Sequence, residues 1–177
     1  MFDLDSFIDD CLTASRAAQP RLAVKEVLDR AVSAPGAVAD ALPPTKAELT
    51  KLHLSDELTI LKVVWAPGMT IRPHDHRTWA SIGIYSGGED NAFYRRDGQG
   101  LEESGGQVLR PADVCLLGDD TIHKVTNPTG EHAGAIHIYG GDFFAIERSE
   151  WDDETHVEQP YDVELTLRNF EAANAGR

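Results

Sequence analysis

The sequence predicts a mainly β domain, either a sandwich or a small barrel, with helices at its N-terminus. After residue 44, short apolar or alternating runs recur, and Gly, Pro, Asn and Asp separate them. Many short strands at this spacing are typical of sandwiches and barrels. A chain of 177 residues has the size of a single domain. We therefore expect one domain at 1–177, with a helical part at 1–44, a barrel at 45–150 and a C-terminal extension at 151–177.

Apolar residues at helical spacing indicate the helices. In the stretch LDSFIDDCLTASRAA the apolar side chains fall on one face, and Asp3 or Asp5 could cap its start. A second helix is expected at 21–33, where Pro and Gly follow directly. A short helical turn at 37–42 precedes the β part, and a brief helix at 165–173 follows it.

The β part divides at its Gly, Pro and Asn residues into nine expected strands. They lie at 48–55, 58–65, 80–85, 91–96, 106–110, 113–117, 122–126, 134–139 and 143–148.

Composition excludes several classes of function. The formal net charge of −14 is opposite to what a nucleic-acid surface requires. No apolar run is long enough for a membrane-spanning helix, and the first residues are acidic where a secretory signal is basic. Two distant cysteines, Cys11 and Cys115, make no disulfide framework. We expect a cytoplasmic protein, monomeric or a small homo-oligomer, that binds neither membrane nor nucleic acid.

Histidines at alternate positions indicate a metal site. Side chains alternate between the faces of a strand, so His74 and His76 should point the same way. His123 begins a later strand, after an excursion long enough to return beside the first. Strands distant in sequence can face each other across the interior of a small barrel. Three histidines there would leave positions open for water, substrate and dioxygen. The alternative is three unrelated strand histidines.

The residues around these histidines resemble a known superfamily. The segment Pro67-Gly68-x-x-x-x-Pro73-His74-x-His76, a Gly-rich turn and Gly118-Asp119-Asp120-x-x-His123 are similar to the two metal motifs of the cupins. The resemblance implies that the β part is a cupin barrel, a double-stranded β-helix. Many cupins place a glutamate ligand five residues after the second histidine, where this sequence has Ser81.

The missing glutamate points to one branch of the superfamily, the thiol dioxygenases of the cysteine dioxygenase and 3-mercaptopropionate dioxygenase type. These enzymes bind Fe(II) with three histidines and use dioxygen. The stretch His-Asp-His-Arg-Thr-Trp at 74–79 resembles theirs, and the segment 135–140 is similar to their Ser-x-His-x-Tyr segment. Arg148 falls where the mercaptopropionate-type enzymes hold the substrate carboxylate. The likeness extends over about residues 20–170.

The resemblance implies catalytic roles for His137 and Tyr139 and a small thiol carboxylate as substrate. Ala135 replaces the serine of the family, so we expect the Ser–His–Tyr hydrogen-bond chain to be cut at one end. Ser81 also replaces the cysteine that mammalian-type enzymes crosslink to the tyrosine.

Several residue roles have alternatives. Arg148 could clamp a carboxylate or form a surface ion pair with a neighbouring glutamate. Arg72, which strand alternation places on the face of the histidines, and Arg77 are rival anion holders. Trp79 could line the substrate pocket or fill the core. A three-histidine cupin enzyme with another substrate, and a cupin that binds metal or ligand without catalysis, are the alternative functions.

Overall fold

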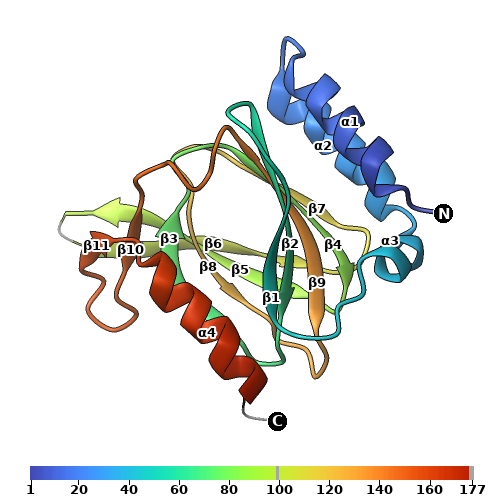
Figure 1. Cartoon of the computed structure of the whole chain (residues 1–177). Coiled ribbons are helices and arrows are strands. Elements are labelled where there is room, and N and C mark those ends of the chain that lie inside the picture. Colours follow the sequence, from blue (N-terminus) through green and yellow to red (C-terminus); the bar gives the residue numbers. More distant parts are fainter. Residues whose placement is uncertain (99, 176–177) are drawn as a thin grey trace.

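The structure is a computed structural model that describes residues 1–98 and 100–175, and it consists of two antiparallel sheets with four helices (Figure 1). The helices are α1 (Leu4–Ser15), α2 (Pro20–Val32), α3 (Pro35–Ala41) and α4 (Val163–Ala175). The strands are β1 (Glu48–Leu54), β2 (Leu58–Trp65), β3 (Thr70–Asp75), β4 (Ala80–Ser86), β5 (Glu89–Asp97), β6 (Gly100–Leu109), β7 (Val114–Leu117), β8 (Ile122–Thr126), β9 (Ala133–Gly140), β10 (Ser149–Trp151) and β11 (Glu158–Pro160).

The two sheets face each other across the main core. One has the order β1-β2-β9-β4-β7 and the other the order β11-β10-β3-β8-β5-β6. Buried residues from both sheets, including Val63, Ile82 and Val125, form one cluster between them. Among the described residues no ladder joins the two sheets, so they are two facing layers rather than one closed barrel.

A second core lies on the outer face of the first sheet, beneath α1, α2 and α3 (Figure 1). Ile136 and Ile138 of β9 pack there with Val24 and Leu28 of α2. Gly83 of β4 allows this close approach, because an added Cβ would lie 2.8 Å from Leu28. The helices thus cover one face of the sheet and leave its other face to the interior.

The helix ends follow from local chemistry. The Asp3 side chain accepts a hydrogen bond of 2.8 Å from the backbone N–H of Ser6, and so caps α1. Pro20 and Pro35 lie in the first turns of α2 and α3, where a missing N–H costs nothing. At the other end of the chain, α4 packs Phe170 against Trp65 with ring centroids 5.3 Å apart.

The expected fold class is confirmed: the protein is mainly β, with helices at its N-terminus. The strand expected at 143–148 is wrong, because this segment is a turn. The Asp142 carboxylate accepts hydrogen bonds from the backbone N–H groups of Phe144 and Ala145 and curls the chain. The strand follows instead as β10, which together with β11 extends the second sheet.

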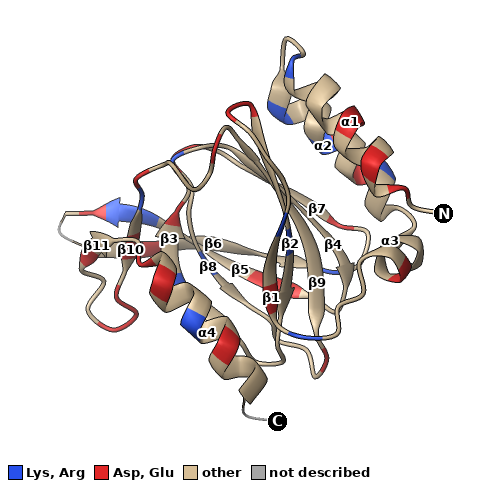
Figure 2. Cartoon of the chain, in the orientation of Figure 1, with Lys and Arg blue, Asp and Glu red and all other residues tan. Residues whose placement is uncertain are grey.

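Charged residues lie on the helices, the loops and several strands (Figure 2), whereas β4, β7 and β9 carry none. The described part of the chain contains no helix that is both long and apolar enough to cross a bilayer.

Candidate metal centre

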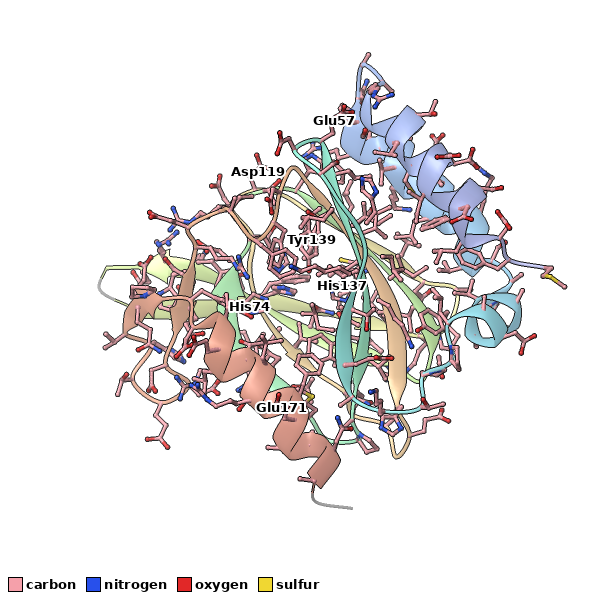
Figure 3. The ribbon with its side chains drawn as sticks, viewed as in Figure 1. Glu57, His74, Asp119, His137, Tyr139 and Glu171 are labelled. Atoms are coloured by element: carbon pink, nitrogen blue, oxygen red, sulfur yellow. The ribbon has the colours of Figure 1, made fainter. Side chains whose placement is uncertain are left out.

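His74, His76 and His123 converge in the interior between the two sheets. Figure 3 shows His74 near His137 and Tyr139, which line the same cavity. His74 of β3 lies directly opposite His123 of β8 in the ladder, and His76 follows the end of β3. The Nε2 atom of His76 lies 3.2 Å from that of His74 and 3.2 Å from that of His123. The predicted three-histidine metal-binding group is thus assembled.

A β-bulge aligns these histidines. The register between β3 and β8 shifts between Ile71 and His74, so regular alternation fails at this point. As a result Ile71, His74 and His76 line the same cavity, while Arg72 does not. The expectation that Arg72 shares the face of the histidines is therefore wrong. Its guanidinium instead lies 3.7 Å from the Glu150 carboxylate.

On two of the three rings, hydrogen bonds place the proton on Nδ1. The Nε2 atom, which faces the other histidines, is then unprotonated. The Nδ1 of His74 lies 2.9 Å from the backbone carbonyl of Arg72, which can only accept, so this nitrogen carries the proton. The Nδ1 of His123 lies 2.6 Å from the amide oxygen of Asn91 and is protonated for the same reason. Lone pairs on the Nε2 atoms of both rings therefore point toward His76.

This arrangement fits a metal ion. Two ligand nitrogens about 2.1 Å from a common ion, at angles of about 90–110°, lie about 3.0–3.4 Å apart. The observed separations of 3.2 Å fall in this range. A single proton on His76 could satisfy only one of the two neighbouring lone pairs, whereas a cation satisfies all three rings. The residues present are thus suited to bind a metal.

Burial keeps the three imidazoles neutral, as metal ligation requires. Desolvation lowers the pKa of His74 from 6.5 to about 4. It also lowers the pKa values of His76 and His123 well below 6.5, and the neighbouring imidazoles add to both effects.

No carboxylate from β4 reaches the histidines. The interior core contains Ala80, Ile82 and Ile84, so by alternation Ser81 faces the helical layer. The ladder pairs Ala80, and not Ser81, with Tyr139. Opposite Tyr139, the residue of β4 that faces the interior is therefore Ala80. The expectation that Ser81 occupies the glutamate position of the cupins is corrected to Ala80. Neither residue offers a carboxylate, so the glutamate ligand is missing from β4 in either case.

His137 and Tyr139 share the interior face of β9, as predicted. The Nδ1 of His137 lies 3.0 Å from the Tyr139 hydroxyl. The Tyr139 ring meets the edge of His76 at a centroid distance of 5.1 Å and stacks on Phe143 at 3.9 Å. Burial raises the pKa of Tyr139, so its hydroxyl keeps its proton.

Two residues that the sequence did not single out complete the interior network. Glu89 begins β5 and is fully buried, and Asn91 follows two residues later on the same face. The Glu89 carboxylate accepts hydrogen bonds from the indole N–H of Trp65 at 2.9 Å and from the Asn91 amide at 3.0 Å. It also lies 3.6 Å from the Nε2 of His137. Glu89 is one of two successive acidic residues after a Gly-Gly turn, and such a pair carries no sequence signal for this position.

Arg148 is buried between two aromatic rings at the mouth of a larger pocket. Its guanidinium carbon lies 4.0 Å from the centroid of Phe143 and 4.2 Å from that of Tyr161. Its Nη1 donates a hydrogen bond of 2.9 Å to the Phe143 carbonyl, whereas its Nε has no hydrogen-bond partner. The ion pairs with glutamate that were the alternative for Arg148 do not occur among the described contacts.

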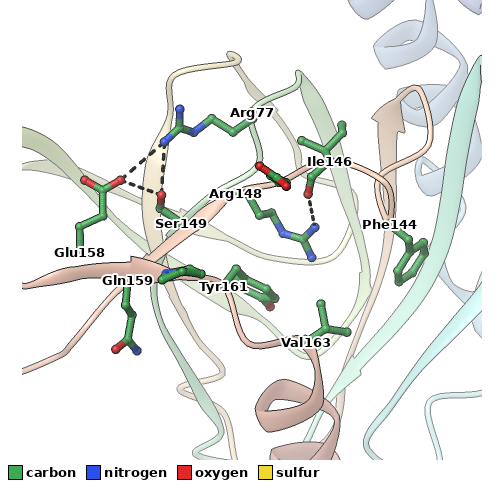
Figure 4. A pocket seen from close by; sticks show the side chains of 11 residues that line it. Arg77, Phe144, Ile146, Arg148, Ser149, Glu158, Gln159, Tyr161 and Val163 are labelled. Atoms are coloured by element: carbon green, nitrogen blue, oxygen red, sulfur yellow. Dashed lines mark hydrogen bonds and ion pairs between the residues drawn. The ribbon is translucent and has the colours of Figure 1, made fainter.

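The pocket beside Arg148 has a volume of about 650 Å³, and its lining includes Arg77, Ser149 and Tyr161 (Figure 4). The cavity among the three histidines measures only about 40 Å³. Tyr161 lines both spaces, and its ring centroid lies 5.7 Å from that of His74. The aromatic ring of Tyr161 therefore stands between the large pocket and the histidines.

The remaining predicted site residues lie elsewhere. Trp79 packs with the core beneath the helices, so the structure does not bring it into either space. Arg77 lines the large pocket, but its guanidinium bonds to the Asp75 carboxylate and to Ser149. Of the three predicted substrate residues, Arg148, Arg72 and Trp79, only Arg148 lines the large pocket, and none lines the cavity among the histidines.

No protein-family model matches the chain. The chain is similar to an RmlC-like cupin with a double-stranded β-helix fold from Methanocaldococcus jannaschii, with 10% identity over 55% of this chain and 82% of that one, at a TM-score of 0.46. It is also similar to an oxalate oxidase bound to glycolate, with 18% identity over 55% of this chain and 52% of that one, at a TM-score of 0.46. A DMSP lyase from Ruegeria pomeroyi matches with 19% identity over 56% of this chain and 46% of that one, at a TM-score of 0.45.

The chain thus spans about half the length of the latter two proteins. These likenesses concern the arrangement of strands and carry no conclusion about activity.

Proposed function

We propose that this protein is a non-haem iron(II) thiol dioxygenase. It would oxidise a small thiol carboxylate, such as 3-mercaptopropionate or cysteine, to the sulfinate, with both atoms of one dioxygen molecule transferred to sulfur. The observation that carries this proposal is the ligand set: three buried, neutral histidines with no carboxylate from β4. Arg148, one aromatic ring away from His74, supports it.

The ligand set suits an anionic substrate. Three neutral imidazoles leave the full charge of a divalent cation uncompensated, whereas a glutamate would cancel part of it. A bound iron(II) ion would stabilise the thiolate form of the substrate and supply open positions for the thiolate and for dioxygen. The cavity is lined by aromatic and aliphatic side chains, including Phe143 and Phe170, that exclude water and so strengthen this attraction.

Arg148 would hold the substrate carboxylate. Its Nε is buried and has no protein partner, and a planar guanidinium pairs with a carboxylate through two parallel hydrogen bonds. Phe143 and Tyr161 fix the plane of the guanidinium from both sides. A carboxylate bound there would direct the thiol of a short substrate toward His74.

Tyr139 would hold a proton close to the reacting sulfur. Its ring lies against His76, and its hydroxyl remains protonated because it is buried. The Nδ1 of His137 lies 3.0 Å from this hydroxyl, so rotation about the C–O bond would turn the proton from His137 to an anion that forms beside it.

Oxygen consumption tests the proposal directly. Iron-loaded protein is mixed with cysteine, 3-mercaptopropionate, cysteamine or mercaptosuccinate, and the sulfinate product is measured. We expect uptake with at least one of the thiols that carry a carboxylate, with one dioxygen consumed per sulfinate formed, and no uptake by the variant His76→Ala. Tightly bound iron without uptake for any of these thiols would contradict the proposal.

Variants of Arg148 test how the substrate is held. Arg148→Ala should raise KM at least tenfold while iron stays bound, because it removes a charge-assisted contact. Arg148→Lys keeps the charge but not the fork, and should show an intermediate KM. If Arg148→Ala lost iron instead, the assigned role would be wrong.

A cupin that binds a metal without catalysis is the second candidate. The small cavity of about 40 Å³ at the histidines favours it, because a substrate and dioxygen together need more space. Iron bound at the three histidines without oxygen uptake is the result that this candidate predicts.

A further inference from the structure

Glu89 is a buried acidic residue that is neither a metal ligand nor a proposed substrate contact, so its presence in the interior needs another explanation. Its side chain is inaccessible to solvent, and a buried charge without partners is strongly destabilising. Two donors and one imidazole surround it: Trp65, Asn91 and His137. Burial raises the pKa of the Glu89 carboxyl, but His137 and the two hydrogen-bond donors outweigh this effect and lower it, so the group is a carboxylate.

One branch from Glu89 leads to a metal ligand. A carboxylate only accepts hydrogen bonds, so the Asn91 amide must turn its NH₂ group toward Glu89. Its oxygen then faces the Nδ1 of His123 at 2.6 Å and requires a proton on that nitrogen. The lone pair of His123 is thereby placed on Nε2, the atom that faces His76. Glu89 thus determines, through one amide, which nitrogen of His123 can bind the metal.

The other branch leads to Tyr139. The Nε2 of His137 faces the Glu89 carboxylate at 3.6 Å and has no other partner, so a proton on this nitrogen is favoured. In the neutral imidazole the opposite nitrogen, Nδ1, then accepts a hydrogen bond from the Tyr139 hydroxyl at 3.0 Å. This contact fixes the rotation of the hydroxyl beside His76.

The second branch bears on the expectation that Ala135 cuts the hydrogen-bond chain at one end. Ala135 lies on the interior face of β9 with His137 and Tyr139, but has no hydroxyl to offer. The hydrogen-bond chain ends at His137, as expected, because its Nε2 has no hydrogen-bond partner; the Glu89 carboxylate of β5 instead faces this nitrogen at an ion-pair distance of 3.6 Å.

We propose that Glu89 is the positioning residue of this site, whose carboxylate orients both the ligand His123, through Asn91, and the hydroxyl of Tyr139, through His137. This role rests on the proposed metal function of the three histidines. It does not require that the substrate be a thiol, because the first branch acts on the metal alone.

The first test measures metal affinity, with ferrous iron titrated anaerobically against a metal indicator. Glu89→Gln keeps the size of the side chain but replaces one of its two acceptor oxygens with a donor, which conflicts with either the Asn91 amide or the Trp65 indole N–H. We expect affinity to fall 10–100-fold, the range found when partners of metal-ligating histidines are removed. Glu102→Gln, at an exposed position of β6, is the matched control and should bind as the wild type does.

The second test separates the two branches. Asn91→Leu removes the amide between Glu89 and His123 but keeps the Glu89 carboxylate beside His137, so metal affinity should fall by a larger factor than kcat at saturating iron. Glu89→Gln should lower both metal affinity and kcat and leave KM for the thiol within twofold. If Glu89→Gln fails to fold, Asn91→Leu still tests the first branch.

Unchanged metal affinity in both variants would overturn the inference, as would an unchanged kcat in Glu89→Gln. A wild-type protein that binds iron but oxidises no thiol would refute the proposed reaction and leave the affinity test of Glu89 intact.

Discussion

The two faces of strand β9 differ in what they bury. Ile136 and Ile138 point outward and pack under the helices, where apolar contact is the dominant interaction. His137 and Tyr139 point inward and lie among hydrogen-bonded polar groups. Both faces are almost inaccessible to solvent. The comparison teaches that burial alone does not distinguish a structural face from a functional one. The distinguishing feature is a set of buried polar groups whose remaining partner is a ligand or metal.

The outward face should account for stability and not for metal binding. Ile138→Ala removes a fully buried side chain and should lower the free energy of unfolding by about 2–5 kcal/mol. Iron affinity of the folded variant should remain that of the wild type. Urea denaturation and metal titration measure the two effects. Val108→Ala, at a position 59% exposed, should cost less than about 0.5 kcal/mol. A large loss of metal affinity in Ile138→Ala would show that the two faces are not independent.

The three buried histidines that the inward face of β9 meets, His74, His76 and His123, should make the metal-free protein sensitive to acid. The pKa of His74 is 6.5 when unfolded and about 4 when folded, so the unfolded state binds more protons between these values. Stability therefore falls as the pH drops through this window. At pH 5 His74 alone should cost about 2 kcal/mol relative to pH 7, and His76 and His123 act in the same direction.

Denaturation of metal-free protein at pH 7 and pH 5 measures this loss. His74→Gln cannot titrate and should lose less stability between the two pH values than the wild type does. Equal losses in the two proteins would mean that His74 does not titrate as its burial requires.

Substitution of Trp79 should lower stability less than Ile138→Ala or acidification does. The structure places it with the outward core, so Trp79→Phe should cost about 1 kcal/mol of stability. The KM for the thiol should stay within twofold of the wild-type value, as measured by oxygen uptake. A KM raised several-fold would instead support the alternative that Trp79 lines the substrate pocket.

The sequence was informative where a pattern depends on near neighbours. His74 and His76 are two residues apart in the chain, and the strands expected between His76 and His123 give the chain enough length to return beside the first strand. The expected face of Arg72 was wrong because a bulge at 71–74 interrupts alternation, and no residue type marks a bulge reliably. The expectation that Ser81 occupies the position facing the site was wrong for a related reason. The register between β4 and β9 decides which residue of β4 lies opposite Tyr139, and this residue is Ala80.

Glu89 and Asn91 could not be predicted, because their role depends on contacts between strands that are distant in sequence. Glu89 meets Trp65 of β2 and His137 of β9 from its position on β5. Only the packing of the two sheets brings these groups together. The strand expected at 143–148 fails for a local reason: the side chain of Asp142 stabilises a turn.

The central claim is that His74, His76 and His123 form a metal centre. Anaerobic calorimetric titration of metal-free protein with ferrous iron, for the wild type and for His76→Ala, tests it most directly. The account predicts one ion bound per chain in the wild type and no binding in the folded variant, because the three nitrogens act together. Binding that is absent in the wild type, or equally tight in both proteins, would contradict it.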